Sequence, residues 1–341
     1  MSTYKKEVGT GVQNNAGDYT GAVQGQLWYN STAGSFQFRS VTTAGAWATG
    51  GDLNTGRRTM GGAGIQTAAL GIGGWEFLPG GPPYSLYLTN TESYDGTSWT
   101  EVNDLNTARG FAGSGGTQTS ALLFGGSNGG GPTAVAESWN GTCWSEVNDL
   151  NTARSQLKGA GADNTSAIAF GGFTPGPTAN AITESWNGTC WSEVNDLNTG
   201  RYGLAGFGIA TSAIAVGGED PTGRLANTES WSGTSWTTVN NTNRTGDGAG
   251  AAGADNTAGL IFGGHEGPPV DARTNKTELW NGTSWSEEAD LTGLAYHYQA
   301  GAGTAAAAIS FGGEGPANQM RTGTEEWTGA GAPVTETITT S

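Results

Sequence analysis

The sixteen residues ESWNGTCWSEVNDLNT fill positions 137–152, and the same letters return unchanged at 184–199. Near-copies occur elsewhere, each with an aromatic residue, a short polar turn and a tryptophan five positions later. The pairs are Tyr94/Trp99, Trp139/Trp144, Trp186/Trp191, Trp231/Trp236 and Trp280/Trp285. The turns read Asp-Gly, Asn-Gly or Ser-Gly, which favour positive φ and close β-hairpins. The quoted stretch therefore predicts a repeated hairpin of two strands.

An apolar run that ends in Gly-Gly precedes each hairpin and gives the repeat its period. The glycine pairs lie at 73–74, 125–126, 171–172, 217–218, 263–264 and 312–313, with steps of 52, 46, 46, 46 and 49 residues. Each unit reads as a Gly/Ala-rich strand, an apolar strand, an aromatic strand and a Trp strand. Six units of this kind predict an all-β fold, a six-bladed β-propeller with small residues at the channel and tryptophans between blades.

The composition excludes several classes of protein. The chain has 341 residues with 61 Gly and 13 Trp, and 13% of its residues are charged. This glycine content opposes a helical fold, and the aromatic content opposes disorder. The formal net charge of −16 offers no basic stripe for phosphates, so we expect no nucleic-acid partner. No apolar run approaches the roughly 20 residues of a membrane span, so we expect no membrane insertion.

The order of apolar residues, Gly-Gly, aromatic, Trp and Arg resembles the kelch repeat. The resemblance rests on SAIAFGG, ESWNGTCW and NDLNTAR and covers roughly residues 45–328. The middle turn departs from it, since it is mostly NGT and not a longer acidic turn. The arginine is present in four units, while Gly246 and Ala295 occupy its places in the last two; the four are Arg57, Arg109, Arg154 and Arg201. SYDGTSW at 93–99 also resembles the sialidase Asp-box but is one residue too short.

Two orphan tryptophans indicate how a ring of blades closes. Trp47 resembles a fourth-strand tryptophan without an aromatic partner before it, and Trp327 resembles a third-strand aromatic without a tryptophan after it. We expect the strand around Trp47 to pair with the strand around Trp327 and remove the open edges. In the alternative, APVTETITT near the C-terminus supplies the last strand.

The repeat divides the chain into an N-terminal attachment segment (1–44), the propeller (45–328) and a C-terminal tail (329–341). The N-terminal segment is expected to be β-rich, with a hairpin in GQLWYNSTAGSFQFRS around residues 31–34. GQLWYN resembles short segments near the start of tailed-phage fibre and virion proteins. The repeat text itself is similar to propeller proteins of marine tailed phages.

Residues that carry chemistry are few. His265 and His297 occupy different places in their repeats, so we expect ordinary histidines and no metal site. We also predict no cofactor and no catalytic residues. Cys143 and Cys190 are expected to be free thiols, because equivalent points of neighbouring units lie too far apart for a disulfide. The recurrent acids are expected at strand ends and turns; they are Glu101, Asp104, Glu146, Asp149, Glu193 and Asp196.

The loops after each Gly-Gly differ strongly between units, whereas the hairpin turns are nearly uniform. In an antiparallel blade these variable loops share a face with the blade-to-blade loops, and loops on a rigid scaffold commonly carry binding. The predicted ligand-binding residues of this loop face are Trp75, Phe77, Tyr84, Tyr87, His265 and Arg273. Aromatic rings with few charges suit a sugar or protein surface.

These observations together predict a non-enzymatic structural or binding protein of a phage virion. It is expected to be a fibre or receptor-binding component that contacts a host-surface glycan or protein. Residues 1–44 are expected to join other virion proteins, and homo-oligomerisation is left open. One alternative is a carbohydrate-active enzyme that uses acids such as Glu76, Glu219 and Asp220. The other is an intracellular kelch-type adaptor.

Overall fold

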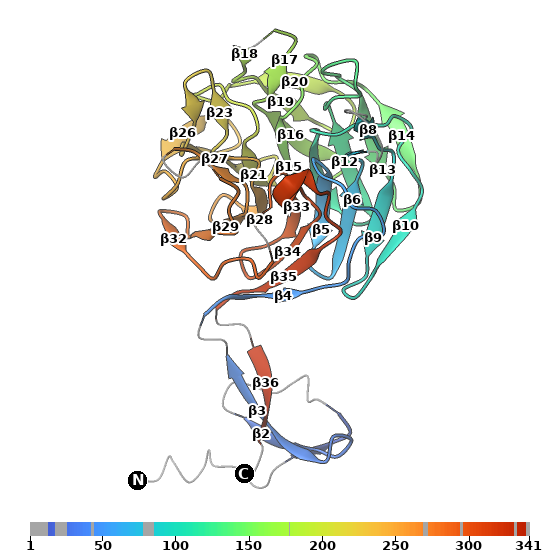
Figure 1. Cartoon of the computed structure of the whole chain (residues 1–341), viewed down its shortest axis with the longest axis vertical. Coiled ribbons are helices and arrows are strands. Elements are labelled where there is room, and N and C mark those ends of the chain that lie inside the picture. The colour runs from blue at the N-terminus through green and yellow to red at the C-terminus, as the bar shows by residue number, and fades with distance from the viewer. Residues whose placement is uncertain are drawn as a thin grey trace. The chain divides into compact units, whose positions relative to one another are not determined.

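The computed structural model is an all-β structure in which antiparallel four-stranded sheets recur, an arrangement consistent with a β-propeller-like fold (Figure 1). It describes residues 13–17, 26–41, 44–77, 85–176, 178–268, 272–293, 296–330 and 333–338. The chain forms a larger unit (Ala46–Trp327) and a smaller unit (Met1–Gly45 with Thr328–Ser341). Within the described residues, the one helix is the short 3-10 helix η1 (Pro316–Asn318), and none could span a membrane.

The larger unit holds a series of four-stranded sheets, and each begins with a Gly/Ala-rich strand. In chain order the sheets are β5 (Gly61–Ile65), β6 (Ala68–Ile72), β9 (Thr91–Tyr94) and β10 (Trp99–Val102); β11 (Gly113–Thr117), β12 (Ser120–Phe124), β13 (Ala136–Trp139) and β14 (Trp144–Val147); β15 (Lys158–Asp163), β16 (Ser166–Phe170), β19 (Thr183–Trp186) and β20 (Trp191–Val194); β21 (Ala205–Ile209), β22 (Ser212–Val216), β25 (Thr228–Trp231) and β26 (Trp236–Val239); β28 (Gly250–Asp255), β29 (Ala258–Phe262), β31 (Thr277–Trp280) and β32 (Trp285–Glu287); and β33 (Ala300–Gly303), β34 (Ala307–Phe311) and β35 (Thr324–Thr328) with β4 (Ala46–Thr49).

Short two-stranded sheets contain the residues that follow four of the Gly-Gly pairs. They are β7 (Trp75–Phe77) with β8 (Ser85–Tyr87), β17 (Phe173–Thr174) with β18 (Thr178–Ala179), β23 (Glu219–Asp220) with β24 (Gly223–Arg224), and β27 (Gly246–Asp247) with β30 (His265–Glu266). In the last of these sheets the partner strand, β27, comes from the connection before β28.

The hairpin in the quoted sequence forms as its turn chemistry predicts. Trp139 and Trp144 face each other at the end of β13 and β14. Gly141 between them has φ of 90°, a conformation that glycine adopts without strain. The Asn140 side-chain oxygen accepts hydrogen bonds from the backbone N–H groups of Thr142 and Cys143, each at 2.9 Å. The recurrent Asn-Gly and Asp-Gly dipeptides are therefore turn residues. Cys143 is a free thiol, as is its counterpart in the next repeat, Cys190.

The sixth sheet combines the two ends of the repeat region. Its fourth strand is β4, which lies beside β35, and the rings of Trp47 and Trp327 are 5.4 Å apart. The expected pairing of these two strands is confirmed. The alternative strand, APVTETITT, does not belong to this sheet, because its β36 (Pro333–Ile338) pairs with β3 (Ser35–Val41) in the smaller unit.

The first strands of the six sheets surround a common centre. Each contacts the first strand of the next sheet along the chain, and β33 contacts both β28 and β5, so the contacts return to their start. Figure 1 shows β5, β15, β21, β28 and β33 innermost in the larger unit. Between them lies a cavity of about 240 Å³. Small residues on these strands permit the approach: a side chain at Gly115 would meet the backbone of Gly161 at 2.7 Å.

Buried charge clamps join neighbouring sheets. Asn106, in the loop after β10, donates two hydrogen bonds of 2.8 Å to Glu137 in the following sheet. Arg109 donates to the other oxygen of Glu137 at 2.5 Å, and both charged side chains are fully buried. The same clamp recurs as Asn54–Arg57–Glu92, Asn151–Arg154–Glu184 and Asn198–Arg201–Glu229. The NDLNTAR marker therefore encodes a link between sheets.

The last two units depart from the arginine positions of the other four. Gly246 does occupy the arginine position, but Arg244 two residues earlier forms the ion pair with Glu278 at 3.3 Å. In the sixth unit the position belongs to Tyr296, not Ala295, which lies outside the described residues. The carbonyl of Tyr296 accepts the hydrogen bond from the preceding Gly-Gly pair that arginine carbonyls accept elsewhere. One extra residue in this loop shifts the register, and sequence spacing alone misplaced it.

The fourth-strand tryptophans form a second link between sheets. Trp144 lies buried and donates its indole N–H to the hydroxyl of Thr91 in the preceding sheet, at 3.0 Å. Four further pairs repeat this bond: Trp47–Thr277, Trp99–Thr324, Trp236–Thr183 and Trp285–Thr228. We call the contact between two neighbouring sheets a seam. At the remaining seam Ala136 replaces the threonine, and the Trp191 indole N–H has no partner among the described residues.

The smaller unit is a separate four-stranded sheet with the order β1 (Gln13–Asn15), β2 (Leu27–Asn30), β3 and β36. The hairpin expected around residues 31–34 is confirmed, since β2 and β3 pair antiparallel across that turn. Trp28 is fully buried. β36, which lies in the predicted C-terminal tail, shares this sheet with β3 of the N-terminal segment.

Candidate functional site

Six residues before the first strands form a ring at the loop-face end of the cavity. Each has a left-handed backbone, with φ between 56° and 63°. Each donates its N–H to the carbonyl of the previous member, over 2.8–3.0 Å, and the last bond closes the cycle. The members of this mouth ring are Thr59, Phe111, Gln156, Gly203, Gly248 and Tyr298. Four of them are not glycine, and a left-handed conformation costs such residues about 1–2 kcal/mol each, so side chains are retained here against a local cost.

The mouth ring carries a lid of side chains. Tyr298 packs edge-on against Phe111, with ring centroids 5.4 Å apart. Its hydroxyl lies 3.4 Å from the side-chain oxygen of Gln156, which belongs to a sheet well removed along the chain. Burial raises the pKa of Tyr298, so this phenol is neutral at physiological pH. These three side chains cover the narrow space of about 20 Å³ under the ring.

Around the mouth ring, each residue that precedes a ring member pairs with the residue that follows a Gly-Gly. The bridges are Arg58–Trp75, Gly110–Ser127, Ser155–Phe173, Tyr202–Glu219, Asp247–His265 and His297–Glu314. This arrangement places the connections between successive sheets and the variable loops on one face, as the strand order predicts. The positions differ in chemistry, because Gly110, Ser127 and Ser155 are small while the other bridged residues are charged or aromatic.

Asp247 is the centre of the polar side. Its carboxylate accepts from Arg224 at 2.5 Å and lies 3.2 Å from His297 Nε2. Burial acts to raise the pKa of Asp247, but the hydrogen bonds and charges of His297 and Arg224 outweigh it and lower the pKa. Burial lowers the pKa of His297 more than Asp247 raises it. The His297 ring stacks on the Tyr298 ring, with centroids 3.8 Å apart, and the centroid of the His265 ring lies 5.4 Å from that of His297. Arg224, Asp247 and His297 thus form a largely buried cluster held by hydrogen bonds.

Arg58 stands at the junction of this group and the aromatic loop. Its guanidinium lies 4.0 Å from the centre of the Trp75 ring and 5.7 Å from that of Tyr298, within cation–π range. It also pairs with the buried Glu314, which a second arginine, Arg273, contacts. Burial lowers the pKa of Arg58 to about 10, which leaves it charged at neutral pH.

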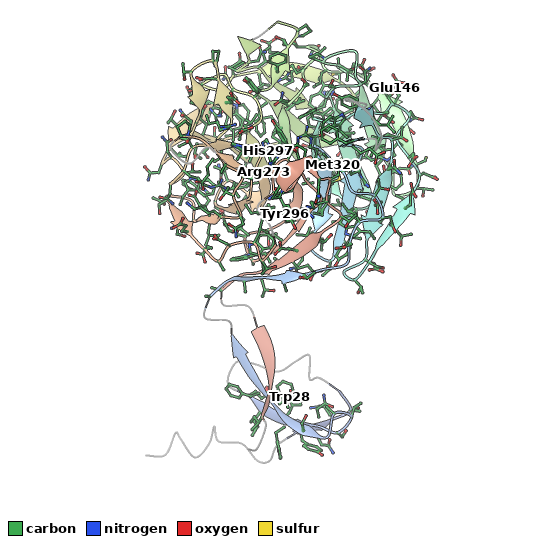
Figure 2. All side chains as sticks on the ribbon, viewed as in Figure 1. Trp28, Glu146, Arg273, Tyr296, His297 and Met320 are labelled. Carbon is green, nitrogen blue, oxygen red and sulfur yellow. The ribbon has the colours of Figure 1, made fainter. Side chains whose placement is uncertain are left out.

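Five of the six site residues predicted from the sequence fall into two groups, and contacts through Glu314 and Arg58 connect these groups. Trp75 lies opposite Tyr87 in the β7–β8 pair, and the ring centroids of Trp75 and Phe77 are 4.5 Å apart. His265 bridges to Arg273, which reaches the first group through Glu314 and Arg58. Figure 2 labels Arg273 and His297 near the centre of the larger unit, and Glu146 on its outer strand. Tyr84 lies outside the described residues.

Sequence patterns do not reveal the mouth of the cavity, which is the end surrounded by the mouth ring. These patterns predict no role in a site for Arg58, Phe111, Asp247, Tyr298 or Glu314, and they predict an ordinary histidine at position 297. The sequence does contain a signal for this site. At the two positions after the repeat arginine, some units have aromatic or charged residues and others have glycine or serine. The recurrent acids do serve strand ends: Asp196, for example, accepts from the N–H of Thr183 at 2.9 Å.

The acids considered for glycoside chemistry are divided by their surroundings. Burial, with the charge of Asp247, raises the pKa of Glu219, while hydrogen bonds from Thr222 lower that of Asp220. Glu76 lies in β7, opposite Leu86. Within the described part of the chain, no three His, Cys, Asp or Glu side chains gather as a metal site. No protein-family model matches the chain, and no curated protein matches its sequence.

Proposed function

We propose that the larger unit is a six-bladed, kelch-like β-propeller, closed by the strand around Trp47, and that it acts as a binding module. The closed cycles of strand contacts and of mouth-ring hydrogen bonds support this architecture, and Trp–Thr bonds at five of the six seams between sheets agree with it. Each cycle returns through the sheet that contains β4. The loop face is then the end of the propeller at which side chains are free to differ.

The observation that carries the binding proposal is the aromatic and cationic group beside the mouth. Trp75, Phe77 and Tyr87 are partly exposed on one short hairpin, and Arg58 supports it from below. Tryptophan and tyrosine present large rigid faces with polar edges, which suits sugar rings or a protein surface. In this proposal the chain is a non-enzymatic virion component that contacts a host-surface glycan or protein. Residues 1–44 join it to other virion proteins.

The test is adsorption of the purified protein to cells of the host and to their surface glycans. We expect Trp75→Ala together with Tyr87→Ala to weaken adsorption at least tenfold, because both aromatic faces are removed. Ile65→Ser is the matched control, since Ile65 is an exposed apolar residue in the first hairpin, 53% accessible. Equal adsorption by both variants would reject the loop face as the binding surface. Antibody-gold labelling of particles tests the virion assignment separately from an intracellular adaptor.

A carbohydrate-active enzyme is the second candidate, favoured by the contrast between Glu219 and Asp220. A raised and a lowered carboxyl pKa in one region is the pattern of an acid and its partner in glycosidases. This candidate predicts that host polysaccharide releases oligosaccharides and that Glu219→Gln stops the release. Binding without any release supports the first proposal.

A further inference from the structure

The central cavity contains one charged side chain among its lining residues, that of Lys158 on β15. Otherwise the lining is mostly glycine and alanine, with a few hydroxyl and apolar side chains. The positions equivalent to Lys158 in the other sheets, by strand register, are Gly61, Gly113, Ala205, Gly250 and Ala300. Five sheets pack with glycine or alanine at this position. The fold therefore does not require a lysine there.

Lys158 lies at the end of the cavity that adjoins the mouth ring. Together with Met60 and Gln299 it lines both the large cavity and the narrow space beneath the mouth ring. The lid of Tyr298 and Phe111 covers that space on the loop face. Residues from the opposite, hairpin ends of the first strands, such as Ile65, also line the large cavity. A ligand that reaches Lys158 therefore enters from the hairpin face.

The charge of Lys158 has no counterpart within the part of the chain that the structure describes. Among the described residues, its ammonium makes no ion pair and no hydrogen bond, although the chain has a net charge of −16 and four lysines in all. Its side chain is only partly buried, and desolvation in the cavity lowers its pKa to about 8. A desolvated ammonium without a partner is unfavourable, and an anion bound beside it removes that cost.

We propose that this cavity binds a small oxyanion, a carboxylate or a phosphate, with Lys158 as its charge partner. A volume of about 240 Å³ accommodates such a group together with water, since one water occupies about 30 Å³. The backbone groups and hydroxyls of the cavity lining, such as Ser114 and Thr304, supply further hydrogen bonds. This site lies on the cavity side of the lid and is independent of the loop-face binding proposed above.

The test follows the four lysines by NMR after labelling with [ε-13C]lysine. In chloride buffer, we expect one signal to titrate well below the others, and its absence in Lys158→Met assigns it. At equal ionic strength, phosphate or acetate is expected to raise that midpoint by about one pH unit. A rise with phosphate alone indicates a phosphoryl ligand, and a rise with acetate indicates a carboxylate. An unchanged midpoint in both anions overturns the proposal.

Thermal unfolding gives an independent readout. The anion that raises the midpoint is expected to raise the Tm of the wild type, because it binds the folded state. Lys158→Arg, which keeps the charge, should retain the rise, and Lys158→Met should lose it. The same rise in Lys158→Met would place the anion elsewhere and contradict the proposal. Adsorption to host cells should be unaffected by Lys158→Met, which separates this site from the loop face.

Discussion

The seams between sheets and the mouth of the cavity are built by the same repeat, yet they differ in kind. At the seams the side chains repeat: in five of the six units the glutamate equivalent to Glu137 is clamped by an asparagine and an arginine, and in the sixth unit Thr292 donates to Glu325 instead. At the mouth only the backbone repeats, since all six ring residues share one conformation while their side chains run from glycine to tyrosine. Side chains therefore repeat between units where packing requires them. Where they differ between units, the chain carries features that packing does not require.

The largest expected effect comes from breaking a clamp. Glu137→Gln leaves Arg109 buried without its counter-charge, and removal of one partner of a buried pair costs about 3–5 kcal/mol. Urea unfolding measures the loss as a fall in the free energy of unfolding. Glu146→Gln, an exposed acid on the adjacent strand, is the matched control and should change it by less than about 0.5 kcal/mol. Equal effects from both changes would mean that the clamp does not hold the seam.

A smaller effect is expected from repairing the one irregular seam. Ala136→Thr supplies a hydroxyl to the unpartnered indole N–H of Trp191, at a position where five other sheets already carry threonine. We expect a gain of about 1 kcal/mol in the free energy of unfolding, the net value of one hydrogen bond. Thr183→Ala, which removes the equivalent bond from Trp236, should lose a similar amount. A loss on Ala136→Thr would contradict the seam assignment.

The smallest effect is expected at the mouth, as a dependence on pH. Because the pKa of His297 is lower in the folded state than in the unfolded chain, the unfolded state binds more protons just below pH 6.5. His297 therefore contributes stability that is lost as the pH falls below about 6.5. Relative to His297→Gln, the wild type should lose up to about 1 kcal/mol between pH 7 and pH 5. A relative gain over this interval would show that Asp247 dominates and raises the pKa instead.

The sequence predicts the parts of this structure that depend on local chemistry and period. Asn-Gly turns, Gly-Gly pairs and paired tryptophans specify the sheets, and the two orphans Trp47 and Trp327 specify the composite sixth sheet. The mouth could not be found in this way, because it forms where residues from six separate loops converge. Spacing also fails where a loop gains a residue, as at Tyr296, or where an arginine acts from a neighbouring position, as Arg244 does.

The most direct measurement of the central claim is amide hydrogen exchange at the mouth ring. The N–H of Thr59 donates to Tyr298, across the join between the first and the last repeats. If the six sheets form a closed propeller, Thr59 should exchange as slowly as Gln156, whose bond lies within continuous repeats. Exchange of Thr59 at the rate of an unprotected loop, with Gln156 still protected, would show an open ring and contradict the account.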